Sequence, residues 1–145
     1  MVREAKKEDL YAVLELYLCL HEDKIPAMTE HLENTWKQII GDENYHLIVK
    51  EESGQIVSSC VCVIIPNLTR SIRPYAVIEN LVTHTDFRRK GCARECLDYA
   101  KKIAKENNCY KMMLLTGSKS PETHRLYEKA GYNSKDKTAY IQWLR

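Results

Sequence analysis

Four cations gather around one glycine near the middle of the chain: Arg88, Arg89, Lys90 and Arg94 lie on either side of Gly91. From residue 93 onward, apolar residues recur at the i, i+3, i+4, i+7 spacing of an amphipathic helix. The first turn of a helix presents unsatisfied N–H groups and partial positive charge, so cations there oppose the helix dipole by up to about 1 kcal/mol each. The clustering therefore favours an anionic ligand, such as a phosphate, over a merely solvated basic helix start.

Gly91 has no Cβ, which would let a phosphate approach the backbone closely. The chain contains neither G-x-x-x-x-G-K-[ST] nor G-x-G-x-x-G, so neither a P-loop nucleotidase nor a Rossmann dehydrogenase is indicated. The phosphate ligand has to be of another kind.

One carboxylate stands in the apolar stretch just before the basic loop. Glu79 lies among Val77, Ile78, Leu81 and Val82, in a strand that we expect to be buried. A carboxylate there is costly unless it is paired, and burial suits it to general-base chemistry. It is either a catalytic base or a structural partner of Arg70 or Arg73.

Asn80 follows Glu79 and points to the opposite face of a regular strand, unless a bulge brings it toward the same site.

The elements that must position these residues can be predicted from periodicity and breakers. A strand, a helix and a strand at residues 75–83, 93–107 and 110–115 form a βαβ unit, so the two strands should be parallel. The whole chain is predicted as a single α/β domain, residues 1–145, with a mixed central sheet flanked by helices. The order is β-α-α-β-β-β-α-β-α-β, over residues 2–5, 7–21, 29–40, 45–51, 55–65, 75–83, 93–107, 110–115, 121–130 and 138–144.

Composition excludes several classes of protein. The 145 residues carry a net charge of only +2, too little for a general nucleic-acid binder. No apolar run approaches the roughly 18 residues of a membrane span, and the N-terminal residues lack the apolar core of a signal peptide. We expect a cytoplasmic protein with no membrane partner.

Six cysteines raise the alternatives of a disulfide framework or a metal site. The chain has no Cys-x-x-Cys, and its five histidines do not cluster with the cysteines. We expect reduced, packed thiols and no bound metal.

The loop Arg88-Arg-Lys-Gly-Cys-Ala93 resembles the [QR]-x-x-G-x-[GA] acyl-CoA pyrophosphate loop of the GNAT N-acetyltransferase superfamily. The element order matches that fold over nearly the whole chain. The segment Leu126-Tyr-Glu-Lys-Ala-Gly-Tyr132 is similar to the (L/F)-Y-x-x-x-G-(F/Y) segment of the same superfamily. The resemblance implies transfer of an acetyl group from acetyl-CoA to a primary amine, without a metal.

The resemblance also implies roles for particular residues. Glu79 would take the proton of the amine, directly or through a water, and Tyr127 would protonate the leaving thiolate. Thr123 stands where many members have an asparagine that contacts CoA, and neighbouring His124 is more simply a solvated residue than a catalytic one. The Val82 N–H is the candidate oxyanion donor. The residues implied in holding acetyl-CoA are Leu81, Val82, Thr83, Arg88, Arg89, Lys90, Gly91, Cys92, Ala93, Arg94 and Thr123.

A narrower resemblance concerns the acceptor. Residues 78–82, 108–111 and 127–129 are similar to the glucosamine-6-phosphate N-acetyltransferases, and the loop and strand also resemble acetyltransferases of small amines. The acceptor site would use Glu79 and Asn80, residues 25–30 and the loop 67–74. In that loop, Arg70 and Arg73 could receive an anionic group or could be plain surface residues.

Several interpretations of the function stay open. A small-molecule amine is the first choice of acceptor, and a protein or peptide amine is the alternative within the same fold. A non-catalytic acyl-CoA-binding module and a nucleic-acid binder are rivals of other classes. Many relatives pair through their C-terminal strands, so the resemblance also implies a homodimer.

Overall fold

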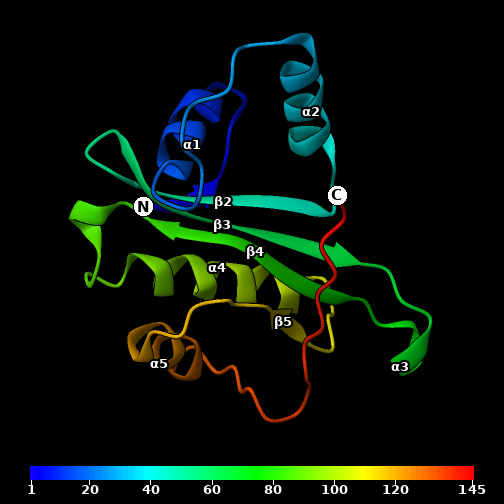
Figure 1. The fold of residues 1–145 in the computed structure, drawn as a ribbon. Coiled ribbons are helices and arrows are strands. Elements are labelled where there is room, and N and C mark those ends of the chain that lie inside the picture. Colours follow the sequence, from blue (N-terminus) through cyan, green and yellow to red (C-terminus); the bar gives the residue numbers. More distant parts are fainter. The chain divides into compact units, whose positions relative to one another are not determined.

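A five-stranded sheet organises residues 1–114 of the computed structural model, which describes all 145 residues (Figure 1). Its strands lie in sequence order, and every neighbouring pair is antiparallel except the last, β4 with β5, which is parallel as predicted. The strands are β1 (Val2–Glu4), β2 (Tyr45–Glu52), β3 (Gln55–Ile65), β4 (Tyr75–Thr83) and β5 (Met112–Leu114).

Helices cover both faces of this sheet. Helices α1 (Leu10–Tyr17) and α2 (Glu30–Gly41) pack on one face, and α4 (Cys92–Glu106) packs on the other (Figure 1). Thr29 caps α2 by accepting the Leu32 N–H at 3.2 Å, as its sequence position predicts. The core on the first face comprises Val13, Leu16, Trp36, Leu47, Val49, Ile56, Val61 and Val82.

On the opposite face, α4 buries five residues of the predicted stripe, Cys96, Leu97, Ala100, Ile103 and Ala104. At its start Cys92 is buried instead of the predicted Ala93, which is half-buried. The mixed α/β class expected from the sequence is therefore confirmed.

Strand β4 is interrupted by a bulge at its centre. Ser59 of β3 pairs with Val82 and Val61 pairs with Glu79, so two residues of β4 oppose one residue of β3. Asn80 takes a left-handed conformation here, with φ at 52°. The bulge bends the strand and turns its side chains away from regular alternation.

Strand β5 covers only the first part of β4. Its pairing runs from Ala76 to Ile78 of β4 and stops there. Beyond Ile78, the edge of β4 that faces β5 has no strand partner. The bulge and this open edge fall on the same stretch of β4.

Some elements are shorter than predicted. The first helix ends at Tyr17, after a 3-10 turn at Lys7–Asp9, and β5 is three residues long instead of six. Met113 of β5 is 40% exposed, because β5 is the edge strand of its sheet. A short turn, α3 (Thr69–Ile72), occupies the expected loop 67–74 and holds three residues in left-handed conformations.

The predicted last strand, residues 138–144, is wrong: this part of the chain forms no strand. It belongs to a second compact unit, Leu115–Arg145, whose one helix is α5 (Pro121–Lys129). The large apolar side chains of this segment are exposed, with Tyr140 and Leu144 at 91% and 90%. A strand needs a neighbour to accept and donate its backbone hydrogen bonds, and these residues have none in the sheet. A single domain over 1–145 stays a prediction.

All six cysteines are free thiols. Cys60 and Cys62 are fully buried, and the Cys60 thiol lies 3.8 Å from the carbonyl oxygen of Cys96. No group of three or more His, Cys, Asp or Glu side chains is placed to hold a metal ion. None of the helices has the length and apolar character that crossing a membrane requires.

Candidate active site

The basic loop connects β4 to α4 through a 3-10 turn, Thr85–Phe87. Arg88 is exposed, and its Nε donates to the carbonyl oxygen of Thr83 at 3.2 Å, which ties the loop to the end of β4. The Lys90 ammonium lies 5.2 Å from the centroid of the Phe87 ring. The loop is thus held at both ends while its cationic groups reach solvent.

Gly91 lets the chain enter the helix. Its φ is +82°, a left-handed value that suits glycine, and a Cβ built on it would meet nothing within 4 Å. The first helical hydrogen bond runs from the Glu95 N–H to the Gly91 carbonyl at 3.0 Å. The N–H groups of Cys92, Ala93 and Arg94 precede that bond and have no acceptor within the helix. This helix start can therefore hold an anion.

The loop cations are not equally available. Arg94 donates through its Nε to Asp98 at 3.0 Å, one turn along α4. Arg89 takes the left-handed φ of 61° and is exposed, like Arg88 and Lys90. Arg88 and Lys90 are thus better placed to meet a ligand than Arg94, whose charge is shared with a carboxylate.

The open edge of β4 leads directly into this loop. Val82 is buried, and its carbonyl oxygen accepts a hydrogen bond from Ser58 Oγ at 3.0 Å. The Thr83 hydroxyl lies 2.9 Å from the same Ser58 Oγ. These contacts fix the end of β4 from the β3 side. The β5 side of the stretch Glu79 to Thr83 stays open to an extended ligand.

The structure corrects the burial expected for Glu79. Both Glu79 and Asn80 are exposed. Glu79 pairs with Val61 of the α1–α2 core, which places it on the face of the sheet that carries those helices. The helices leave the middle of β4 uncovered, so the carboxylate is accessible instead of being held in an apolar interior.

Two tyrosines that the sequence did not single out lie near the bulge, Tyr45 within reach of the Glu79 charge and Tyr17 against Asn80. Burial and, secondarily, the nearby Glu79 charge raise the pKa of Tyr45 at the start of β2. Burial raises the pKa of Tyr17 at the end of α1 to about 12, although a hydrogen bond with the Asn80 side chain acts in the opposite sense. Both hydroxyls are thus neutral donors near the bulge. No sequence spacing signals this, because α1, β2 and β4 meet only in the folded sheet.

The arginines of the loop 67–74 lie elsewhere. They follow Ile65, at the end of the sheet opposite the β4–α4 connection (Figure 1). The Arg73 guanidinium donates to the carbonyl oxygens of Asn108 and Cys109, both at 3.1 Å, and so caps the chain after α4. Arg70 stacks over the Tyr110 ring at 5.5 Å. By strand rise, this end is about 13 Å from Glu79.

The remaining predicted residues lie in the second unit. Tyr127 is half-buried in α5, and its ring meets that of Tyr132 edge-on, with centroids 6.3 Å apart. The Thr123 hydroxyl lies 3.2 Å from Ser118 Oγ. The His124 Nε2 lies 2.8 Å from the Ser118 carbonyl oxygen, so Nε2 carries a proton and donates it to that oxygen. The ring thus stabilises the loop before α5.

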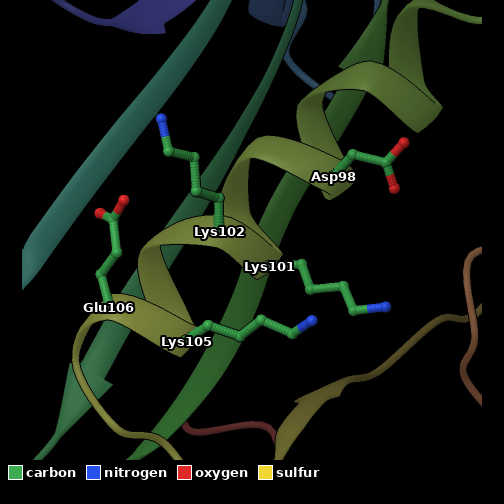
Figure 2. A pocket seen from close by; sticks show the side chains of 5 residues that line it. All are labelled: Asp98, Lys101, Lys102, Lys105 and Glu106. Atoms are coloured by element: carbon green, nitrogen blue, oxygen red, sulfur yellow. The ribbon is translucent and has the colours of Figure 1, made fainter.

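A shallow hollow on α4 is lined by Asp98, Lys101, Lys102, Lys105 and Glu106. In Figure 2, Lys102 and Glu106 extend to one side of the helix and Asp98, Lys101 and Lys105 to the other, so the five side chains have no common centre. Three lysines lie between two carboxylates here, as on the solvent side of an ordinary amphipathic helix. The hollow is not a competing active site.

An open strand edge that ends in an anion-binding helix start fits a transferase that holds an extended, phosphate-bearing co-substrate against its sheet. Residues 10–132 match the profile of the acetyltransferase (GNAT) family. The chain therefore belongs to that family and is an acyltransferase.

Solved structures agree with this membership. A protein of Agrobacterium tumefaciens strain C58 with a provisional acetyltransferase assignment is 34% identical over 99% of both chains, with a TM-score of 0.90. A Bacillus halodurans protein described as a transcriptional regulator is 26% identical over 99% of both chains, with a TM-score of 0.84. Glucosamine-6-phosphate N-acetyltransferase of Arabidopsis thaliana shares the fold, at 23% identity and a TM-score of 0.82, covering 100% of this chain and 96% of that one.

Proposed function

We propose that this protein transfers the acetyl group of acetyl-CoA to the primary amine of a small molecule, by direct attack in a ternary complex. The observation that carries the proposal is the continuous path along β4: an accessible carboxylate at a bulge, an open strand edge, and a cationic loop at the start of α4.

The chain's own groups suit the parts of acetyl-CoA. Arg88, Lys90 and the free N–H groups at the start of α4 would hold the pyrophosphate. The open backbone of Leu81 to Thr83 would pair with the amide-bearing pantetheine arm, as a strand pairs with an edge.

The reaction needs one proton removed and one supplied. The amine nitrogen forms a bond to the thioester carbon, and the carbon–sulfur bond breaks. Glu79 takes the amine proton, directly or through a water, and Tyr127 gives its phenolic proton to the departing thiolate. Both protons are then exchanged with solvent.

The surroundings of Glu79 favour a particular acceptor. The exposed carboxylate attracts an ammonium group, and Tyr17 and Tyr45 offer neutral hydroxyls and ring surface near the bulge. Arg70 and Arg73 lie at the far end of the sheet, and Arg73 is occupied by backbone carbonyls. We therefore propose that the amine of the acceptor binds at Glu79. We do not propose that an anionic group of the acceptor binds at Arg70 and Arg73.

A thiol-release assay tests the proposal. Acetyl-CoA is offered with a panel of amines: amino sugars with and without phosphate, polyamines, amino acids and peptides with a free N-terminus. We expect release that depends on a small amine. Release that depends only on peptides would favour the protein-acetylating alternative, and binding without release from any amine would favour a passive acyl-CoA module.

We also propose a homodimer that acts in the cytoplasm. The exposed apolar side chains Tyr140, Ile141, Trp143 and Leu144 support association through the C-terminal segment, and the six free thiols suit a reducing compartment. Light scattering behind a sizing column should give twice the chain mass of 16.9 kDa. A chain shortened before Thr138 should give the single mass.

A further inference from the structure

One charged side chain is buried in this protein, and the reaction outlined above does not use it. Lys50 lies near the end of β2 and is only 7% exposed, whereas every other charged residue is at least partly open to solvent. Burial of a lone ammonium is costly, so its partners indicate why it is there.

Those partners tie the sheet to the start of α4. The Lys50 Nζ donates to Glu95 Oε2 at 2.6 Å and lies 3.0 Å from Glu52 Oε1. Glu95 belongs to the first turn of α4, and its N–H makes the first helical bond, to Gly91. The hydrogen bonds that Lys50 donates to the two carboxylates raise the pKa of Lys50, and the ammonium lowers the pKa of Glu52. The lysine therefore keeps its charge.

The same network reaches the loop. The charge of Lys90 also acts on Glu52 and lowers the pKa of that carboxyl. Lysine and glutamate thus alternate from Lys90 through Glu52 and Lys50 to Glu95. Cys92, the first residue of α4, is buried, and all four charges act on the pKa of its thiol.

An acidic side chain in the first turn of a helix competes with a bound anion for the same partial positive charge. Glu95 is such a side chain, and Glu52 lies close to it, since both reach the same nitrogen. Without Lys50, two carboxylates would stand unneutralised near the place where the pyrophosphate binds.

We propose that Lys50 is a positioning residue for acetyl-CoA: it holds the first turn of α4 against β2 and neutralises Glu95 and Glu52, so that the loop accepts a diphosphate. This inference rests on the proposed function and adds a residue outside the loop to the determinants of co-substrate affinity.

The decisive variant is Lys50→Met, which keeps the aliphatic length and removes the charge. We expect the KM for acetyl-CoA to rise about tenfold while kcat stays within about twofold. Acetyl-pantetheine, a thioester with no phosphate, should show equal KM values for variant and wild type. Lys50→Arg should restore most of the affinity, as should Lys50→Met combined with Glu95→Gln.

The matched control is Lys101→Met, which removes one exposed lysine from the outer side of the same helix (Figure 2). It should leave both KM values unchanged. Calorimetric titration with acetyl-CoA gives a binding constant independent of turnover, and thermal unfolding confirms that each variant is folded at the assay temperature.

The outcomes separate this inference from the proposed function. If wild type binds no acetyl-CoA, the proposed function fails. If wild type binds it and Lys50→Met binds it equally well, the inference fails and the function stands. If Lys50→Met lost affinity equally for acetyl-CoA and for acetyl-pantetheine, the inference would also be overturned, because an equal loss would show a general distortion of the fold.

Discussion

Glu79 suits the proposed role of general base because its carboxylate is accessible, and not because it is buried. The carboxylate is exposed on the middle of β4, at a bulge where Asn80 departs from strand geometry. A general base must reach the proton of its substrate, and an exposed position satisfies this condition.

Glu79→Gln keeps the size of the side chain and removes its ability to take a proton. We expect kcat to fall roughly a hundredfold or more, with little change in acetyl-CoA affinity. Steady-state kinetics with the best amine would measure this, and Glu106→Gln on the solvent side of α4 is the control. An unchanged kcat would show that Glu79 is not the base.

Tyr127→Phe should have a smaller effect. A free thiol has a pKa of about 8.5, so the leaving thiolate is a moderately stable group and its protonation assists the reaction only modestly. We expect kcat to fall about tenfold and activity to persist. The ratio of the rates at pH 6 and pH 8 should also differ between the variant and wild type. If the variant matched wild type at both pH values, Tyr127 would have a packing role alone.

At the scale of elements, the unit β4–loop–α4 joins the two ends of the proposed co-substrate site. At Gly91 the chain turns into the helix, and its φ of +82° is a left-handed value that glycine adopts easily. Any other residue there has to adopt a left-handed conformation at about 1–2 kcal/mol.

Gly91→Ala should therefore weaken acetyl-CoA binding as well as lower stability. Gly54→Ala is a matched control, because Gly54 in the β2–β3 turn has a φ of +79° and equally open surroundings. Both variants should lose similar unfolding free energy in urea. Only Gly91→Ala should raise the dissociation constant of acetyl-CoA; an equal rise in both would show that general destabilisation is the cause.

Elements with strong local patterns could be predicted from the sequence. The α4 stripe, the Thr29 cap and the parallel pairing of β4 with β5 follow from periodicity, capping and the βαβ rule. The strand predicted at 138–144 was wrong because an apolar, aromatic stretch shows only that a segment can pair, and a strand forms only where an edge accepts it. The exposure of Glu79 and the closeness of Tyr17 and Tyr45 depend on packing between distant segments, which no local pattern encodes.

At the scale of the whole molecule, buried thiols link stability to pH. Burial raises the pKa of Cys62 to about 12 and that of Cys96 to about 11, and raises the pKa of Cys60 well above its usual value. These thiols stay protonated in the folded protein while they ionise near pH 9 in the unfolded chain. The unfolded chain then binds fewer protons, so stability falls as pH rises above about 9.

Urea unfolding at pH 8 and pH 10.5 in reducing buffer tests this linkage. Cys96 alone should account for a loss of about 2 kcal/mol over that interval. Cys96→Ala should be less stable than wild type at pH 8 but should lose less on going to pH 10.5. If the variant and wild type lost the same amount, ionisation of this thiol would not be the source of the alkaline sensitivity.

Thermal unfolding with and without acetyl-CoA tests the central claim most directly, namely that the loop before α4 binds this co-substrate. At a hundred times the dissociation constant, binding should add about 2.7 kcal/mol of stability, a rise in Tm of roughly 5–10 °C for a chain of this size. Pantetheine, which has no phosphate, should give little or no rise. No shift with acetyl-CoA at millimolar concentration would contradict the account, and the roles proposed for Glu79, Tyr127 and Lys50 would fall with it.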